Sequence, residues 1–493
     1  MSLTDSRYWK VPNRLIVGFS LIATVSLLSG CAPIPPKGIT PELKSIDQYE
    51  TQQAFQAPQC DWPTENWWEN YHDAQLDILI EEGLANSPSM TVAAARFRQA
   101  QAMTSIAASV LYPQVYGEAE AGTQKLSRNY SLPPQFVPHG THGFASMALD
   151  FNWELDFFGK NRAALEAAIS AEEAAAADLA QARLIIASSI AVEYGELAHL
   201  FYTKDTVSSI TKVRRQNLSL FNQRHQHGLD TLTAVKQAEA RLAESEQELI
   251  AIDERISLQQ NKLAALMGAG PDRGLAITRP DLNLKAGYSL PDELHMSLLG
   301  RRPDITAARL RVESMVSQIE RQKAEFYPDV NLSAFIGYQG AIAKVLKSGS
   351  DYYGIVPAIN LPIFTAGRLT AQLEGVRAEY AEAVGLYNQT LTNALQEISD
   401  ALVSQRKLVA QLEKNRLAVD AAREAHRLVQ NRYKGGLANY IEVLSAEETL
   451  LQTLRSQADL RARIYTLDVS MVKALGGGYE KPETKDRPTA EQS

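Results

Sequence analysis

The sequence predicts a mainly helical protein with a small membrane-spanning β part, in which one unit of two strands and a long helical hairpin occurs twice. Residues 139–270 and 363–481 contain no proline. Both stretches are rich in Ala, Leu, Glu, Gln and Arg, which are strong helix formers. Each is broken once near its middle by a glycine turn, at Gly228 and at Gly436, which lie 208 residues apart. Two matched helical stretches with matched turns indicate an internal duplication.

Each hairpin begins with a helix far longer than a compact core requires. The first runs from Lys160 to Gln226, which is 67 residues, or about 100 Å of helix at ~1.5 Å per residue. The second begins at Arg368, again 208 residues later. An uncapped helical pattern beyond about 25 residues is typical of a coiled coil or a helical repeat. The returning arms are shorter and cover residues 230–267 and 439–475.

Two separate helices are expected to complete these shorter arms. Residues 88–111 and 303–326 each open with a proline, which suits the first position of a helix. Stacked on the returning arms, they give composite rods of about 90 Å. Two continuous and two composite rods of similar length predict the wall of a tube rather than a compact core.

Four short segments ahead of the hairpins show the period-2 alternation of strands. Residues 145–155 carry an apolar side chain at every second position, and residues 330–338 repeat the pattern. Residues 355–361 repeat it again, although Pro357 weakens that assignment, and residues 115–121 show it least. About ten residues is the length of a tilted membrane-spanning strand. An ordinary soluble sheet is the alternative, but such sheets seldom lie between helices of this length.

The N-terminus predicts export and a lipid anchor. Residues 1–30 read as a lipoprotein signal peptide, with an apolar stretch at 15–28 that follows three basic residues, Arg7, Lys10 and Arg14. The run Leu28-Ser-Gly-Cys31 resembles a bacterial lipobox, in which the cysteine receives diacylglycerol and palmitate. Ala32 favours sorting to the outer membrane by the same resemblance. The alternative is an incidental cysteine behind an ordinary signal peptide.

The rest of the chain divides into an extended N-terminal segment (31–85), a first repeat (86–280), a second repeat (281–478) and a disordered tail (479–493). Hydrophobic residues make up 45% and charged residues 22% of the chain, which is typical of a folded protein. Its net charge of −8 argues against a nucleic-acid partner. No stretch after residue 31 reaches 18 apolar residues, which predicts no transmembrane helix. Lipidation of Cys31 leaves Cys60 without a partner, so no structural disulfide is expected.

Signals of enzymatic chemistry are absent from the sequence. It has no GxSxG, HExxH or Walker loop, so no catalytic residues and no cofactor besides the lipid on Cys31 are expected. The glycine-rich residues 268–274 follow a helix and contain a proline, which indicates a helix stop rather than a phosphate site. Two histidine pairs could contact a metal, but solvated loop histidines are much commoner, so no metal site is predicted: His139 with His142, and His225 with His227.

Several short motifs occur in an order and spacing that resemble one known family. They are Leu28-Ser-Gly-Cys31, Trp67-Trp68, Leu299-Gly-Arg-Arg-Pro303-Asp304-Ile305, Phe326-Tyr-Pro328, Leu361-Pro-Ile-Phe364, Gly436-Leu437 and Ala474-Leu-Gly-Gly-Gly478-Tyr479. Over residues 31–480 the chain resembles the outer membrane factors, the TolC-like export ducts, in their lipoprotein branch. The resemblance implies a homotrimer with a twelve-stranded barrel in the outer membrane and a helical barrel in the periplasm. It also implies two partners, a periplasmic membrane-fusion adaptor and an inner-membrane efflux pump.

Elementary physics supports a shared barrel. Four strands cannot close, because about eight is the smallest number seen in membrane barrels. An open sheet would leave edge N–H and C=O groups unpaired in lipid, at a cost of several kcal/mol each. Three copies of the chain would provide twelve strands, which are enough to enclose a lumen.

The predicted function is passive conduction of multidrug efflux substrates to the cell exterior, with gating at the periplasmic tip. The family often places acidic residues just after the second hairpin turn. Here Glu442 stands at one such position and Ser445 at the other, so a trimer would have one ring of carboxylates, and strong cation selectivity is in doubt. A solvated helix charge is the alternative role for Glu442. The turns Gly228-Leu229 and Gly436-Leu437 are expected to dock the adaptor, because an exposed leucine at a loop tip needs a partner.

A lipid-anchored periplasmic coiled-coil adaptor or scaffold without a pore is the competing class. Adaptors also contain long hairpins, but they usually pair them with a strand-rich lipoyl-like block, and they lack two copies of a strand–hairpin unit. No such block is evident in this sequence. The identity of the exported substrates is not encoded in any motif of the chain.

The lipid assignment predicts the behaviour of a Cys31→Ser variant. This variant should accumulate as an uncleaved or a soluble periplasmic form, because serine provides no thiol for the diacylglycerol. Metabolic labelling with palmitate checks the expectation. Label on the Ser variant at the level of the unaltered protein would show that Cys31 is not the anchor.

Overall fold

The computed structural model describes residues 34–36, 38, 41–51, 53–55, 59–127, 129, 133–137, 139–282, 290–291 and 300–481. The signal peptide (1–30), the lipid site Cys31 and residues 482–493 lie outside the described residues, so the expectations for them stay predictions. The predicted tail begins too early, because Glu480 forms an ion pair with Arg301 (2.6 Å).

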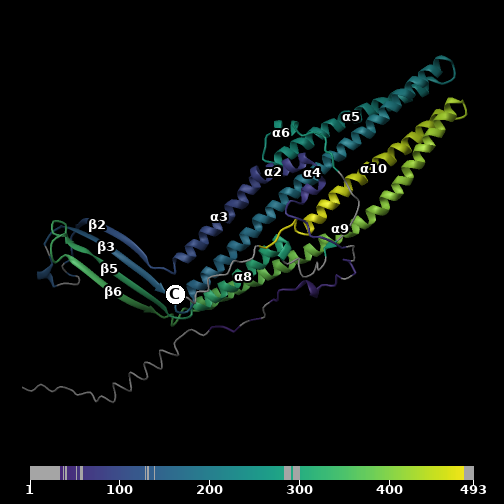
Figure 1. Cartoon of the computed structure of the whole chain (residues 1–493). Helices are drawn as coiled ribbons and strands as arrows, with labels where there is room; N and C mark the ends of the chain where they lie inside the picture. Colours follow the sequence, from purple (N-terminus) through teal and green to yellow (C-terminus); the bar gives the residue numbers. More distant parts are fainter. Residues whose placement is uncertain are drawn as a thin grey trace, which may run out of the picture. The chain divides into compact units, whose positions relative to one another are not determined.

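Four antiparallel strands form one sheet in the spatial order β2-β3-β5-β6 (Figure 1). They are β2 (Gln114–Gln124), β3 (His142–Leu155), β5 (Asp329–Ala341) and β6 (Asp351–Asn360). Each repeat provides two neighbouring strands, and pairing of β3 with β5 joins the repeats. All four predicted strands are confirmed, with somewhat different limits. Pro357 belongs to β6 and pairs with Leu332 of β5. Because β6 is an edge strand of the protomer, the missing N–H of a proline is tolerated there.

The register gives the sheet one apolar face. Alternate residues of a strand point to opposite faces, and directly paired residues point to the same face. Pairing therefore places one continuous set of side chains together: Val115, Ala119, Ala121, Ala145, Met147, Leu149, Phe151, Trp153, Leu155, Val330, Leu332, Ala334, Ile336, Tyr338, Tyr353, Ile355 and Ile359. Ile336, Ile355 and Ile359 are 63%, 75% and 73% exposed, as side chains of a lipid-facing strand are.

Two helical hairpins of equal dimensions follow the strand pairs. The first consists of α4 (Lys160–Gln226) and α5 (Leu232–Leu266), and the second of α9 (Arg368–Lys434) and α10 (Tyr440–Ala474). The long helices have 67 residues each and the returning helices 35 each. All eight ends obey the offset of 208 residues, which confirms the duplication at the level of structure.

Both composite arms form as predicted. The separate helices α3 (Pro88–Ser109) and α8 (Pro303–Ala324) have 22 residues each. A Cβ on Gly268, just past α5, would lie 3.0 Å from Cδ of Pro88, so the end of α5 abuts the start of α3. A Cβ on Gly476, just past α10, would lie 1.9 Å from the carbonyl oxygen of Arg301. Only glycine leaves room for these end-to-end approaches.

The glycine-rich segment 268–274 is a helix stop, as predicted. Gly268 has a φ of 74°, which favours glycine at the end of a helix. A short helix, α6 (Pro271–Leu275), follows it. The other short elements among the described residues are η1 (Ile46–Gln48), η2 (Trp67–Tyr71), η3 (Pro134–Phe136) and the parallel pair β1 (Gln59–Cys60) with β4 (Leu290–Pro291).

The expectation of an extended segment over 31–85 is wrong for its second half. Residues 74–86 form α2 (Ala74–Asn86), which the side chain of Asp73 caps by accepting hydrogen bonds from Gln75 N (3.0 Å) and Leu76 N (3.3 Å). Such a cap satisfies two of the free N–H groups at a helix start. The preceding turn buries Trp67 and Trp68 in the main core with side chains of α4, α5 and α10.

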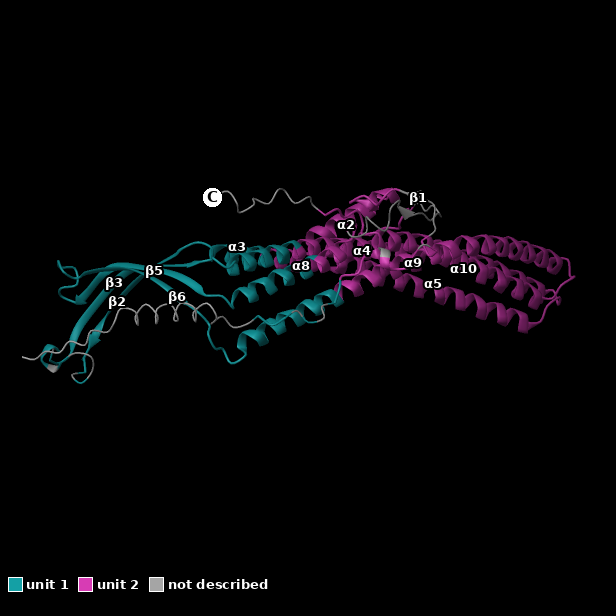
Figure 2. Ribbon diagram, turned by 90° about the horizontal axis from the view of Figure 1, so that it is seen from below, with its two compact units in different colours: residues 1–42, 99–173, 310–385 teal, residues 43–98, 174–309, 386–493 magenta. Residues whose placement is uncertain are grey.

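The chain forms two compact units that cut across the repeats (Figure 2). Unit 1 takes residues 1–42, 99–173 and 310–385 and contains the sheet. Unit 2 takes residues 43–98, 174–309 and 386–493 and contains the hairpin tips and the main core. Each unit combines parts of both repeats, because a long hairpin cannot bury its apolar face by itself.

Among the residues that the structure describes, one helix, α4, is apolar enough over an 18-residue window to cross a membrane by length and composition alone. The mean hydropathy of that window is 1.4 and 39% of it is buried. Ile190, Tyr194 and Leu197 of α4 are completely buried in the core of unit 2, so packing within the chain accounts for apolar side chains of this helix.

Candidate gate and docking surface at the hairpin tips

Each hairpin turn presents apolar side chains to solvent. Leu229 and Leu437 are 64% and 73% exposed, and Leu232 and Ile441 behind them are 56% and 60% exposed. The two turns share one geometry, because Gly228 and Gly436 have φ values of 73° and 75°. The amides of the two leucines each donate to a carbonyl five residues back, at 2.8 Å. The structure thus places the four predicted docking residues at equivalent, accessible turns.

A polar contact ties the two tips to each other. Tyr433, near the end of α9, donates its hydroxyl to Asp230 in the turn of the first hairpin. Arg224 of α4 donates to the same carboxylate at 2.7 Å and lies over the Tyr433 ring at 4.7 Å. Burial, and then the neighbouring Asp230, raise the pKa of the Tyr433 hydroxyl, which keeps it protonated as a donor. We refer to Arg224, Asp230 and Tyr433 as the tip latch.

An apolar cluster lies next to the tip latch. The rings of Phe221 and Tyr433 meet edge to face at 5.4 Å, and Tyr440 meets Phe221 at 6.3 Å. Val235 and Val443 complete the contact between all four hairpin helices. Neither this contact nor the latch is predictable from local sequence patterns, because the residues that meet across the hairpins lie about two hundred positions apart in the chain.

Glu442 has a defined structural role in addition to its exposure. It forms a capping box with Asn439: Glu442 N donates to Asn439 Oδ1 (3.0 Å), and Asn439 N donates to Glu442 Oε1 (3.2 Å). Its other carboxylate oxygen lies 3.8 Å from Arg432. The pattern Asn-x-x-Glu at a helix start is a recognisable capping signal, so this role of Glu442 could have been predicted from the sequence.

Glu442 and Ser445 are brought together in one groove. A pocket of about 520 Å³ between α9 and α10 is lined by Ala422, Ala425, Val429, Asn439, Ile441, Glu442, Ser445, Ala446 and Thr449. Ser445 is exposed, and its carbonyl oxygen accepts a hydrogen bond from Thr449 Oγ1 (3.0 Å). Both aperture candidates are therefore accessible side chains on one face.

The polar face of the sheet is acidic. Glu118, Glu120 and Asp150 lie on the face opposite the apolar one, and the four strands contain no Lys or Arg. Glu154 and Asp329 form ion pairs with Lys160 at the start of α4. The uncompensated carboxylates therefore give this face a negative potential.

The candidate histidines make local hydrogen bonds. His225 Nδ1 lies 3.0 Å from the carbonyl oxygen of Asp230, and His142 Nε2 lies 2.6 Å from that of His139. Within the described part of the chain, no group of three or more His, Cys, Asp or Glu side chains is arranged to hold a metal ion.

The sheet has one exposed apolar face, as membrane-spanning strands do, and one acidic face. Two long helical hairpins with exposed apolar tips follow it in the sequence. This combination defines the class of outer-membrane export channels. The chain belongs to the outer membrane efflux protein family, which matches residues 79–269 and 294–477. The first matched segment begins seven residues ahead of the first predicted repeat (86–280), and the second lies within the second predicted repeat (281–478). The protein is thus an outer-membrane protein, as the N-terminal sequence predicted.

Individual relatives agree with this assignment. The chain is 27% identical over 476 residues to the multidrug resistance outer membrane protein MdtP of Escherichia coli K12, covering 95% of this chain and 97% of the relative. It is 30% identical over 485 residues to MdtQ of Escherichia coli O157:H7, covering 92% and 96%. The crystal structure of the outer membrane protein VceC from Vibrio cholerae superposes with a TM-score of 0.81 at 44% identity, covering 85% of this chain and 100% of that one. The predicted TolC-like fold is confirmed.

Proposed function

We propose that this chain is the exit duct of a tripartite multidrug efflux system and works as a homotrimer. The observation that carries the proposal is the four-stranded sheet, which has an exposed apolar face and two open edges, β2 and β6. Lipid does not tolerate such edges, so neighbouring copies would complete a twelve-stranded barrel. The acidic face of the sheet would then line a lumen filled with water.

Conduction by this duct would be passive. Among the described residues the hairpins carry ion pairs and apolar contacts, and an inner-membrane pump would supply the energy. A periplasmic membrane-fusion adaptor would connect pump and duct at the exposed leucines of the tips, where it would cover the apolar side chains. The names of MdtP and MdtQ refer to multidrug resistance, which favours drug-like cargo here.

A lipid anchor at Cys31 fits the position of the residues that follow it. Arg377 of α9 donates hydrogen bonds to the carbonyl oxygens of Pro35 (2.9 Å) and Pro36 (2.8 Å). This contact holds the chain against α9 in unit 1, the unit that contains the sheet. A diacylglycerol and palmitate on Cys31 would then be attached close to a segment that is held on α9, from which they could insert into outer-membrane lipid.

The competing class of a pore-free adaptor or scaffold has less support. Its long hairpins are present, but an adaptor has no use for a sheet with one exposed apolar face. The sheet and the family membership both favour a channel.

The proposed function predicts a trimer that conducts ions. Protein purified in detergent should run as a heat-resistant trimer band, and in planar bilayers it should produce discrete current steps. A lipidated monomer that produces no current under any gating condition would favour the scaffold.

The tip assignment predicts that Leu229→Asp combined with Leu437→Asp abolishes drug export. The carboxylates would place charge where the adaptor must cover an apolar side chain, while trimer assembly, which does not use these side chains, should persist. Drug susceptibility and cross-linking to the adaptor measure the effect. Leu346→Asp, on an exposed leucine of the loop between β5 and β6, is the matched control, and normal resistance in the double variant would contradict docking at the tips.

The aperture assignment predicts opposite effects for two substitutions. Glu442→Ala should shift the reversal potential toward lower cation preference, and it should also remove the hydrogen bond that the Glu442 side chain accepts in the capping box of α10. Glu442→Gln, which can still accept the cap hydrogen bond, separates charge from capping. Ser445→Asp should raise cation preference by adding a second ring of carboxylates. If reversal potentials are the same in all three variants, these side chains do not face the lumen.

A further inference from the structure

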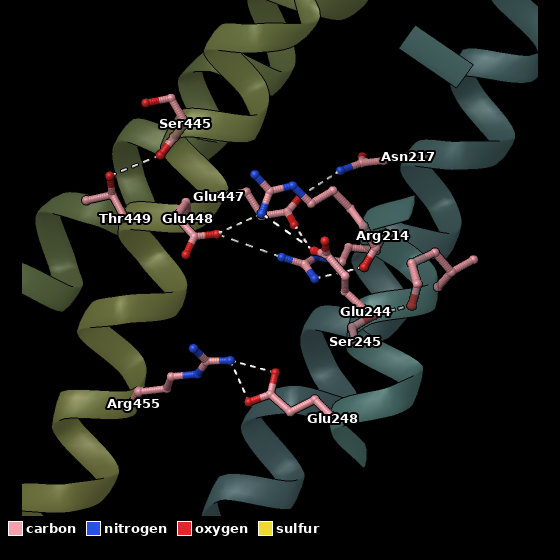
Figure 3. A network of polar contacts seen from close by, with 12 residues as sticks. Arg214, Asn217, Glu244, Ser245, Glu248, Ser445, Glu447, Glu448, Thr449 and Arg455 are labelled. Carbon is pink, nitrogen blue, oxygen red and sulfur yellow. Dashed lines mark hydrogen bonds and ion pairs between the residues drawn. The ribbon is translucent and has the colours of Figure 1, made fainter. Parts of the chain in front are cut away.

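The long hairpins compensate their buried charges within the chain (Figure 3). Arg214 Nε of α4 lies 2.8 Å from Glu447 Oε1 of α10, and the two side chains are 7% and 5% exposed. Farther along α10, Arg455 donates to both carboxylate oxygens of Glu248 on α5 (2.5 and 2.6 Å). A buried charge that is paired in this way needs no counter-charge from outside the chain.

The end of the sheet that joins the helices also pairs its charges. Lys160, at the start of α4, forms ion pairs with Glu154 and, at 3.0 Å, with Asp329. Arg162, one turn into the same helix, pairs with Asp156 (3.3 Å). These two basic side chains therefore have partners within the chain.

The loop between β5 and β6 lies at the opposite end of these strands, and its charge is of one sign. Residues 341–350 contain two lysines, Lys344 and Lys347, and no acidic residue. Both lysines are exposed, as is Asp351 at the start of β6. Among the described residues, no carboxylate forms an ion pair with either lysine. The loop therefore has a positive charge that the described part of the chain does not neutralise.

Hydrogen bonds hold this loop in a defined conformation. Lys344 N donates to the carbonyl oxygen of Ala341 (2.7 Å), Lys347 N to that of Lys344 (2.9 Å), and Ser350 N to that of Lys347 (3.1 Å). Ser350 Oγ donates to the carbonyl oxygen of Lys344 as well (2.9 Å). Successive turns with this three-residue spacing bring side chains three positions apart to the same side. The two lysines are therefore neighbours.

The loop folds against the apolar face of the sheet. Gly340 pairs with Ala145 and stands two residues after Tyr338, so its Cβ position is on the apolar face. A Cβ there would lie 3.4 Å from Ser350 Oγ and 3.8 Å from Cα of Val345. Val345 and Ala145 are 9% and 8% exposed, because the loop covers this part of the face. The loop, and the two lysines with it, therefore lies on the side of the sheet that faces lipid.

The position of the loop along the strands corresponds to the headgroup region of a membrane. The apolar band of a membrane barrel is about 25 Å tall, and a strand that rises ~3.4 Å per residue at a tilt of about 40° crosses it in about ten residues. The stacked rings of Phe158 and Tyr327 (4.9 Å, 10°) mark the boundary next to the helices, since aromatic girdles lie at membrane interfaces. Counted from the start of β5, the band ends near Gly340. The two lysines follow directly after it.

We propose that the β5–β6 loop binds a phosphate-bearing lipid of the outer leaflet, with Lys344 and Lys347 on its phosphate groups. The loop is at the far end of the strands from the helices, so it faces the cell exterior when the helices occupy the periplasm. Lysine binds phosphate as a point charge, and a basic residue near an anionic membrane surface strengthens association a few-fold. The acyl chains of the lipid would lie along the apolar side chains of β3 and β5. This lipid site goes beyond the proposed conduction and does not require it.

A lipid titration tests the site. Full-length protein purified in detergent is mixed with diphosphoryl lipid A in mixed micelles, and bound lipid is counted by native mass spectrometry. Lys344→Gln combined with Lys347→Gln should weaken binding on the order of tenfold, because two contributions of a few-fold each are lost. Added salt should weaken binding to the unaltered protein, and lipid A without its phosphates should bind the unaltered protein as weakly as the double variant binds the phosphorylated form.

Two matched variants separate the charge of the loop from other effects. Lys344→Arg combined with Lys347→Arg keeps both positive charges and should retain the lipid. Lys407→Gln combined with Lys414→Gln removes two exposed lysines of α9, and it should bind lipid A as the unaltered protein does. The trimer band of each variant reports assembly. If the Gln double variant does not assemble, each Gln substitution alone should lose a few-fold in binding.

Several outcomes would overturn the lipid site. Equal binding of lipid A to the unaltered protein and to the Gln variants is one, and equal binding of lipid A with and without phosphates is another. Displacement of the lipid by inorganic phosphate alone would indicate a site for the free anion instead. Unchanged lipid binding together with a shifted reversal potential in the Gln double variant would place the lysines in the lumen. Because the titration needs no current, failure of the proposed channel would not affect its result.

Discussion

Every backbone N–H and C=O group of a strand in lipid needs a hydrogen-bond partner, and the rest of this molecule depends on that constraint. The protomer provides four strands with open edges at β2 and β6. Other copies must then complete the sheet. A helix that follows a strand directly in the chain therefore lies in the ring that these copies form. The 67-residue helices α4 and α9 each follow the strands of one repeat. If the copies share one β-barrel, these helices must also share one helical barrel. Exposed apolar side chains such as Ile250 and Leu258 on α5 fit such neighbours.

The duplication kept geometry and changed chemistry. The turns at Gly228 and Gly436 have nearly the same φ and the same amide hydrogen bonds. The side chains around them differ, and the tip latch uses Asp230 from one turn and Tyr433 from the other. A chain that repeats its backbone can thereby make unlike contacts on its two sides.

Much of this architecture could be predicted from the sequence, because it depends on local patterns. The predicted helix ends just before the turn at Gly228, and the observed α4 has the predicted limits, Lys160 and Gln226. Alternation of apolar side chains located all four strands, and Gly268 marked a helix stop. The helix α2 was missed, although Asp73 and the spacing of Leu76, Leu79 and Ile80 provide a cap and an apolar helical face. The capping box of Asn439 and Glu442 was equally readable.

By itself, then, the sequence determined the class of fold, the duplication, the length of each hairpin and the exposed tips, since helix and strand periodicity are properties of neighbouring residues. Only the tertiary structure decided which side chains meet across the hairpins. Asp230 and Tyr433 are 203 positions apart, and Arg214 and Glu447 are 233 apart. Their pairing depends on which face each helix turns toward the other. The relative orientation of these faces depends on packing over the whole length of four helices, so it cannot be predicted from any local sequence pattern.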